Sequence, residues 1–216
     1  MKKLVLATQK GGPGKTTLAG HIAVAAELAG IGPVVMIDTD PQGSLAAWWN
    51  AREAESPAFA SSTIKDLSTK LEALAQAGFK LVVIDTPPAI TTSIESVVEL
   101  ADLVLIPARP SPHDLRAVGS TVDIVNAAKR PFAFIATQAK PNARLTVQAM
   151  ATLSAHGEVA PVLVHDRVDF ASSMIDGQTV QETGPNGRSA DEVGKILAFV
   201  LERLKIKTKA KKREAL

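Results

Sequence analysis

A glycine-rich loop, set between a short apolar segment and an alanine-rich one, constrains this sequence more than any other feature. Positions 9–17 read Gln-Lys-Gly-Gly-Pro-Gly-Lys-Thr-Thr. Lys3–Thr8 has the composition of a buried strand, and Thr16–Ala29 that of a helix closed by Gly30. Glycines leave no side chain between backbone N–H groups and an anion, and the start of the helix adds partial positive charge. The loop therefore predicts a phosphate-binding site.

The residues of this loop have distinct expected roles. Lys15 is the cation that would reach the β- and γ-phosphates of a nucleotide, and the hydroxyl of Thr16 is placed to hold Mg²⁺. The common pattern G-x-x-x-x-G-K-S/T has a glycine where this chain has Gln9, so the match is to a deviant form with a second lysine, Lys10. A plain strand-to-helix turn is the alternative interpretation. The residues expected to bind the nucleotide are Gly11, Gly12, Pro13, Gly14, Lys15, Thr16 and Thr17.

A second apolar segment, Val34–Asp38, ends in acidic residues. Asp38 and Asp40 are at positions i and i+2 of an extended segment, so their side chains point the same way. At the carboxyl edge of a parallel sheet that direction faces the crevice where ligands bind. Asp40 could orient or deprotonate an attacking water, and Asp38 could help to hold the hydration shell of a metal. The alternative is structural, with Asp40 as the N-cap of the next helix.

A third apolar segment, Phe79–Pro88, contains four consecutive aliphatic residues that end at Asp85. A buried strand has little reason to finish in a bare charge unless a cation or hydrogen-bond donors await it. We expect Asp85 to hold Mg²⁺ through water, opposite Thr16. These segments therefore predict a phosphate and Mg²⁺ site, with Thr16, Asp38 and Asp85 at the metal.

The order of the segments predicts the fold class. A strand, a helix and a strand within about 40 residues predict a right-handed crossover and a parallel sheet. We expect an α/β P-loop NTPase with a mostly parallel central sheet flanked by helices on both faces, over residues 1–204, and a basic tail over residues 205–216. Further strands are predicted at Leu103–Pro107, Phe132–Thr137 and Val162–His165. Helices are predicted at Ser44–Arg52, Ile64–Ala77 and Ser189–Lys205, and irregular segments at Ala51–Ser62, Ala108–Leu115 and Asp176–Gly187.

Composition excludes several classes of protein. The chain has 216 residues, of which 46% are hydrophobic, so it can bury a substantial core. It has no cysteine, which excludes disulfides, thiolate metal sites and iron–sulfur ligands. Its four histidines have no metal-ligand spacing. No apolar run resembles a signal segment or reaches membrane-spanning length, so we expect a cytoplasmic protein.

Three segments together, Lys10–Thr17, Asp38–Ser44 and Ile84–Pro88, resemble the motifs of the ParA/MinD group of deviant Walker-A ATPases, closest to the short ParA-type partition ATPases. The resemblance runs over most of residues 1–204. It implies that Lys10 reaches across an ATP-sandwich homodimer to the partner's phosphates. It also implies that Lys10, Lys15 and Asp40 support hydrolysis of ATP to ADP and phosphate.

The same resemblance implies partners and a cellular role. In this family the dimer binds DNA without sequence preference, and intrinsic hydrolysis is weak until a ParB-like or other cargo adaptor protein stimulates it. We expect a nucleoid-associated protein that segregates or positions a plasmid, a chromosome region or a protein cargo. Arg167 follows the predicted strand Val162–His165, at a position that resembles a family arginine implicated in DNA contact.

The basic tail is the second candidate for DNA contact. Residues 205–216 have a net charge of +5, while the whole chain has +2, so residues 1–204 sum to −3. Such a tail offers sequence-independent attraction to DNA phosphates, and the alternative is a solvated, disordered terminus. Its basic residues are Lys205, Lys207, Lys209, Lys211, Lys212 and Arg213.

Two other functions stay open at this point. A MinD-like membrane switch would need an amphipathic terminal helix, whereas residues 205–216 offer only Ile206 and Leu216 as large apolar side chains, so membrane insertion is not expected. A biosynthetic P-loop enzyme is the third possibility.

Overall fold

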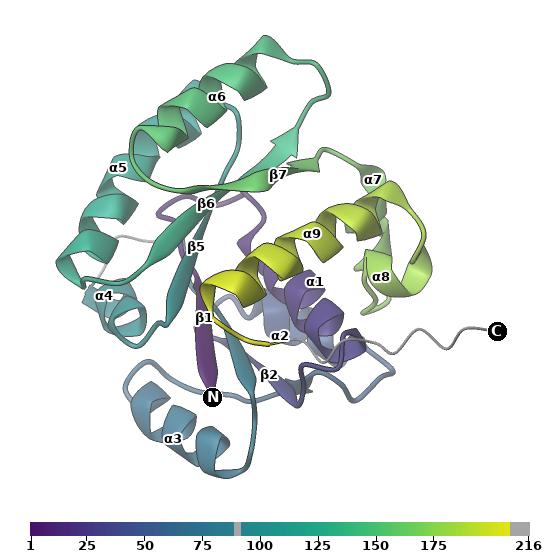
Figure 1. The fold of residues 1–216 in the computed structure, drawn as a ribbon. Helices are drawn as coiled ribbons and strands as arrows, with labels where there is room; N and C mark the ends of the chain where they lie inside the picture. The colour runs from purple at the N-terminus through teal and green to yellow at the C-terminus, as the bar shows by residue number, and fades with distance from the viewer. Residues whose placement is uncertain (89–91, 208–216) are drawn as a thin grey trace.

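A parallel β-sheet forms the centre of the molecule (Figure 1). The computed structural model describes residues 1–88 and 92–207, with the side chains of positions 92 and 93 left aside. Within these residues seven strands pair in the order β3-β2-β4-β1-β5-β6-β7, and every pairing is parallel. The strands are β1 (Lys2–Leu6), β2 (Val34–Asp38), β3 (Ala58–Phe59), β4 (Leu81–Asp85), β5 (Leu103–Ala108), β6 (Phe132–Ala139) and β7 (Val159–His165).

Helices cover both faces of the sheet, which confirms the predicted α/β class (Figure 1). Helices α1, α2, α7, α8 and α9 contribute side chains to one hydrophobic core, and α3, α4, α5 and α6 to the other. They are α1 (Lys15–Leu28), α2 (Ser44–Asn50), α3 (Leu67–Gln76), α4 (Thr92–Glu99), α5 (Pro112–Ala127), α6 (Arg144–Ser154), α7 (Val168–Ser173), α8 (Val180–Thr183) and α9 (Arg188–Arg203).

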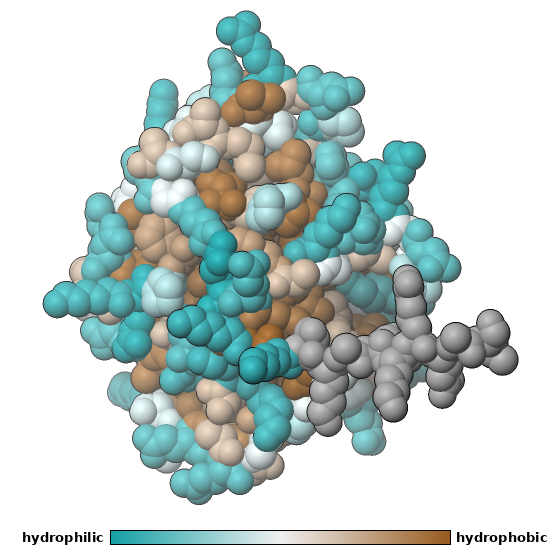
Figure 2. Space-filling model, viewed as in Figure 1, coloured by the Kyte–Doolittle hydropathy of each residue, from teal (hydrophilic) through white to brown (hydrophobic). Residues whose placement is uncertain are grey.

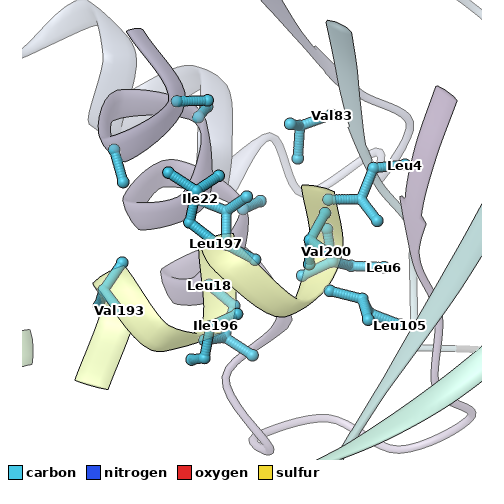
Figure 3. Packing of buried hydrophobic residues seen from close by; sticks show 14 of the residues in the cluster. Leu4, Leu6, Leu18, Ile22, Val83, Leu105, Val193, Ile196, Leu197 and Val200 are labelled. Carbon is cyan, nitrogen blue, oxygen red and sulfur yellow. The ribbon is translucent and has the colours of Figure 1, made fainter. Parts of the chain in front are cut away.

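The period of two along the strands divides the apolar residues between the two cores. On β1, Leu4 and Leu6 belong to the core under α1 and α9, while Val5 belongs to the core under α3, α4 and α5. Figure 3 shows Val200 of α9 beside Leu4 and Leu6 of β1, and Ile22 of α1 beside Leu197 of α9. Because both faces are covered, the middle strands read as continuous aliphatic runs.

The carboxyl ends of three neighbouring strands lie at one level. Leu6 of β1 and Asp38 of β2 are both register partners of Asp85 on β4. Two threonines tie these ends together, because Thr39 Oγ1 donates to the carbonyl of Asp85 at 2.7 Å and Thr86 Oγ1 donates to the carbonyl of Leu6 at 2.8 Å. The loops that follow the three strands therefore form one edge, and the three acidic or glycine-rich motifs meet there.

Some predicted boundaries differ from the structure. Strand β3 lies inside the predicted connector Ala51–Ser62, and a two-residue strand is too short to show alternation. Helix α8 lies inside the predicted loop Asp176–Gly187, where Thr179 and Glu182 form a capping box. Helix α5 begins at Pro112, inside the predicted irregular segment Ala108–Leu115, because proline is well tolerated at the first helical position.

One face of the surface is mostly hydrophilic. On the face shown in Figure 2, hydrophilic side chains project over most of the area and hydrophobic residues are visible between them.

None of the helices within residues 1–88 and 92–207 combines the length and apolar character needed to cross a bilayer. Lys205 and Lys207 are exposed beyond α9. The other predicted tail contacts, Lys209, Lys211, Lys212 and Arg213, lie outside the described residues.

Candidate nucleotide-binding site

The glycine loop connects β1 to α1 and leaves the start of that helix open. Gly12 and Gly14 have φ angles of 95° and 89°, a region that glycine enters without strain. Gly14 is the N-cap of α1, and no side chain caps the helix there. The first N–H groups of α1 and the positive end of its dipole are therefore available to an anion. Such a loop can hold the phosphates of a nucleotide.

Lys15 lies inside the loop. Its side chain is buried, and Nζ donates to the carbonyl of Lys10 at 3.4 Å. Burial lowers the pKa of Lys15, while the nearby charges of Asp85 and Asp40 act in the opposite direction. A desolvated ammonium at the centre of a glycine loop would interact more strongly with phosphate oxygens than an ammonium in water. The position fits the phosphate-binding role expected from the sequence.

Thr16 and Asp85 meet at the end of β4. Thr16 Oγ1 donates to Asp85 Oδ2 at 2.5 Å, and the N–H of Thr86 donates to Asp85 Oδ1 at 3.0 Å. Asp85 is 1% exposed. Burial, together with the charge of Asp38, raises the pKa of the Asp85 carboxyl to about 7, although the hydrogen bond from Thr16 and the charge of Lys15 act to lower it. A buried carboxylate with a raised pKa is one that a bound cation would stabilise.

The oxygens gathered here fit Mg²⁺, which prefers hydroxyl, carboxylate, water and phosphate oxygens. Within residues 1–88 and 92–207, no group of three or more His, Cys, Asp or Glu side chains could hold a metal alone. An ion at Thr16 and Asp85 would therefore be shared with the phosphates of a nucleotide, as Mg²⁺ usually is.

The two remaining carboxylates make different contacts. Asp38 accepts hydrogen bonds from three backbone N–H groups, at 2.9 Å from Asp40, 2.9 Å from Leu45 and 3.1 Å from Ala46. Asp38 thus caps the start of α2, a role that the alternative interpretation of the sequence gave to Asp40. Asp40 Oδ1 accepts one hydrogen bond, from the N–H of Gln42 at 3.0 Å, and its charge acts on Lys15. The metal role of Asp38 stays a prediction.

A cavity of about 330 Å³ adjoins the loop on the side of β6 and β7. Gln138 lines it and donates from Nε2 to the carbonyl of Gly12 at 2.7 Å, and Thr137 Oγ1 donates to the carbonyl of Pro13 at 2.8 Å. The size and the position beside the phosphate loop suit the base and ribose of a nucleotide. Its lining residues are Pro13, Gly14, Thr17, Leu18, Thr137, Gln138, Val164, His165, Asp166, Arg167, Phe170 and Ala171.

Comparison with known proteins agrees with this geometry. Residues 4–180 match the family model described as the CobQ/CobB/MinD/ParA nucleotide binding domain. The chain belongs to this family. The membership confirms the resemblance to ParA and MinD proteins, and it also takes in the CobQ and CobB branches.

Members of the family that resemble this chain include partition and positioning proteins. The chain is 33% identical over 213 residues to the maintenance of carboxysome distribution protein A of Halothiobacillus neapolitanus. The match covers 92% of the chain and 95% of that relative. It is 26% identical to the chromosome-partitioning ATPase Soj of Thermus thermophilus, covering 94% and 97% of the two chains. The solved structure of a Cyanothece McdA–ATP complex has the same fold, with a TM-score of 0.75, 22% identity and coverage of 97% and 98%.

Lys10, the lysine of this family member that precedes the glycines, does not point into its own phosphate loop. Its Nζ contacts Asp114 Oδ1 at 2.8 Å, and its side chain is 37% exposed. Arg109 donates from Nε to Asp114 Oδ2 at 2.5 Å and lies against Gly12, where a Cβ atom would be 3.4 Å from Arg109 Nη1. Neither Arg109 nor Asp114 received a role from the sequence, in which Ala108–Leu115 is predicted as an irregular segment. Their position just after β5, at the carboxyl edge of the sheet, is the signal that could have indicated them.

Arg167 lies at the wall of the cavity in this family member. Its Nη2 contacts Glu192 Oε1 at 2.8 Å, and the same carboxylate contacts His165 Nδ1 at 2.7 Å. Glu192 therefore joins α9 to the end of β7. The side chain of Arg167 is 25% exposed. Its contact with DNA stays a prediction, and the structure adds its place beside the cavity, which the sequence analysis did not foresee.

We expect Asp85→Asn to stabilise the nucleotide-free protein at neutral and alkaline pH. The folded-state pKa of about 7 exceeds the ordinary value of 3.8. The folded protein thus keeps a proton that the unfolded chain has released, and the free energy of unfolding falls as pH rises from 3.8 to 7. Three pKa units correspond to about 4 kcal/mol at pH 8, and the gain from asparagine shrinks toward pH 5.

Urea denaturation of the two proteins from pH 5 to pH 8 measures this difference. Asp123→Asn, which changes an exposed carboxylate on α5, is the matched control and should shift the free energy of unfolding little at any pH. Equal stability of wild type and Asp85→Asn at pH 8 would contradict the raised pKa.

Proposed function

We propose that this protein is a ParA-type ATPase in which ATP joins two subunits into a sandwich dimer that binds DNA without sequence preference. The observation that carries the proposal is the contrast between the two lysines of the loop. Lys15 is buried within its own phosphate site, whereas Lys10 lies on the rim with 37% of its side chain exposed. A cation on the rim is available to the phosphates of a second subunit.

The residues of one subunit have separate roles in ATP hydrolysis. The loop from Gly11 to Thr17 binds the phosphates, and Lys15 neutralises their charge. Thr16 and Asp85, with Asp38 behind them, would hold Mg²⁺, which supplies further charge neutralisation on the phosphates. Asp40 orients the attacking water. Lys10 of the partner subunit completes the site, and completion of a phosphoryl-transfer site in trans can raise rates by ~10³–10⁵. Isolated subunits should therefore hydrolyse ATP weakly.

The cargo we propose is a protein assembly or a chromosome region, carried on the nucleoid and recognised through a ParB-like or other adaptor protein that stimulates hydrolysis. The support comes from the relatives, since one is named for maintaining carboxysome distribution and another for partitioning chromosomes. The 33% identity to the carboxysome protein over nearly the whole chain favours a protein compartment.

A MinD-like membrane switch is the second candidate, and the packing of Ile206 disfavours it. Ile206, one of two large apolar residues in the tail, packs partly buried against the core that contains α1 and α9. A side chain that contacts its own protein is not free to insert into a bilayer. A biosynthetic enzyme of the CobQ or CobB kind would instead need a second substrate for phosphoryl transfer.

Light scattering after size exclusion tests the function directly. The protein should be monomeric with ADP and dimeric with ATPγS and Mg²⁺, and the dimer alone should retard a plasmid fragment in a gel. Sedimentation with anionic lipid vesicles is the comparison arm. A protein that stays monomeric with ATPγS, or that binds vesicles and not DNA, would overturn the proposal.

The tail should contribute to DNA binding through charge alone. Four cations per subunit are removed by changing lysine or arginine to glutamine at Lys209, Lys211, Lys212 and Arg213. If about four of the eight in a dimer contact phosphates, the log–log salt slope of DNA affinity should flatten by about 3 to 4. Nucleotide binding should not change. A salt slope equal to that of wild type would show that the tail is merely solvated.

A further inference from the structure

The carboxylate of Asp114 lies between two cations at the rim of the phosphate loop. Asp114 is in the first turn of α5, where its N–H donates to Ser111 Oγ at 3.2 Å. Its side chain is 3% exposed, compared with 37% for Lys10 and 33% for Arg109. The carboxylate is therefore the fixed part of the cluster, and Lys10, which has the more exposed side chain, is the part that can move.

We infer that Asp114 is a positioning residue that holds Lys10 within its own subunit until the phosphates of a second subunit compete for it. The inference rests on the proposed role of Lys10 in a sandwich dimer. Lys10 Nζ makes a single contact with Asp114, to Oδ1 at 2.8 Å, from a side chain that solvent reaches. A triphosphate carries more negative charge than one carboxylate, so it can draw the ammonium away.

Arg109 makes this release possible. A buried carboxylate that loses its last partner is strongly destabilised, so a lysine as sole partner would be held permanently. Arg109 adds two contacts to Asp114, from Nε to Oδ2 at 2.5 Å and from Nη2 to Oδ1 at 3.2 Å. When Lys10 leaves, the guanidinium still occupies both oxygens. Burial raises the pKa of the Asp114 carboxyl, but the hydrogen bonds from Arg109 and Lys10 outweigh it and lower that pKa, so the group stays ionised.

The same carboxylate also fixes Arg109 against the phosphate loop. The guanidinium lies over Gly12, close enough that any Cβ there would touch it. The cluster of two cations and one anion has a net charge of +1 beside a site for a polyanion. Departure of Lys10 toward the partner thus leaves a neutral Arg109–Asp114 pair in place, and the rim of the loop is not disturbed.

Chemical labelling of Lys10 tests the contact without any assumption about dimers. The nucleotide-free protein is treated briefly with an amine-acetylating reagent, and modification of each lysine is measured by mass spectrometry. Asp114→Asn keeps the shape of the side chain and removes its charge. Labelling of Lys10 should rise roughly two- to fivefold in this variant, the effect of losing a partly exposed ion pair, while exposed Lys140 should not change. Asp114→Glu, which keeps the charge, should restore much of the protection.

A double-mutant cycle then tests the consequence for assembly. With ATPγS, Asp114→Asn should dimerise at a concentration roughly two- to fivefold lower than wild type, because no ion pair must first break. In a Lys10→Ala background, where we expect no ATPγS-dependent dimer, the same substitution should not restore dimerisation. Equal Lys10 labelling in wild type and Asp114→Asn would overturn the inference even if ATPγS produces dimers. A labelling difference in a protein that never dimerises would instead overturn the proposed function. Dimerisation restored by Asp114→Asn in the Lys10→Ala background would also overturn the inference, because Asp114 would then act without Lys10.

Discussion

Lys15→Ala should bind ATP at least about a hundredfold more weakly than wild type, because charge-assisted hydrogen bonds to phosphate are worth roughly 1.5–3 kcal/mol each and Lys15 would make more than one. The loop and the N-terminus of α1 would remain, but they supply only partial charges. Isothermal titration with ATP and Mg²⁺ measures the loss.

The fold should survive this substitution. Lys15 is buried beside Asp85, and a buried carboxylate without its cation would ordinarily destabilise the protein. Burial already raises the pKa of Asp85 to about 7, so loss of Lys15 would raise it further and the carboxyl would simply keep its proton. Thermal unfolding of Lys15→Ala near that of wild type at pH 7 would separate lost binding from lost folding.

Lys10→Ala is the matched control, because it removes the same side chain five positions earlier. Lys10 is on the rim and contacts Asp114, so its loss should leave ATP binding by single subunits close to wild type and prevent the ATPγS-dependent dimer. If both variants lost ATP binding equally, the division between a cis and a trans lysine would be wrong.

Consecutive aliphatic residues made the centre of the fold predictable. The strands β1, β2 and β4 are buried on both faces, so their sequences are unmistakably apolar, and the motifs that follow them could be assigned to one edge. The phosphate loop is local in sequence, and its helix follows at once. In the structure, the register of β2 and β4 places Asp38 beside Asp85 at this edge.

Contacts between distant parts of the chain could not be predicted in this way. Lys10 and Asp114 are separated by 104 positions, so no spacing rule connects them. Helices α4 and α6 were not predicted, and Arg109 received no role within the predicted irregular segment Ala108–Leu115. The alternative interpretation made Asp40 the cap of α2, whereas in the structure Asp38 at the end of β2 accepts from the N–H groups of Leu45 and Ala46. The fold brings Lys10 and Asp114 together, and the neighbours of each residue in the sequence do not indicate the contact.

Asp40→Ala should lower the rate of ATP hydrolysis by about 10²–10⁴, the usual contribution of a positioned acid or base, while ATP binding persists. The ATP-bound dimer should therefore accumulate on DNA. Little stability should be lost, since Asp40 contributes one hydrogen bond to the N–H of Gln42, and such a bond is worth about 1 kcal/mol. Phosphate release followed over hours with plasmid DNA present measures the rate, because intrinsic turnover is expected to be slow.

Asp38→Ala distinguishes a catalytic carboxylate from a structural one only two positions away. It removes the acceptor of three backbone N–H groups at the start of α2, so the protein should lose about 1–2 kcal/mol of unfolding free energy. Asp40→Ala should differ from it in stability, which should stay near wild type while hydrolysis falls. Hydrolysis at the wild-type rate in Asp40→Ala would mean that another group positions the water, and that Asp40 only accepts the hydrogen bond from the N–H of Gln42 in this turn.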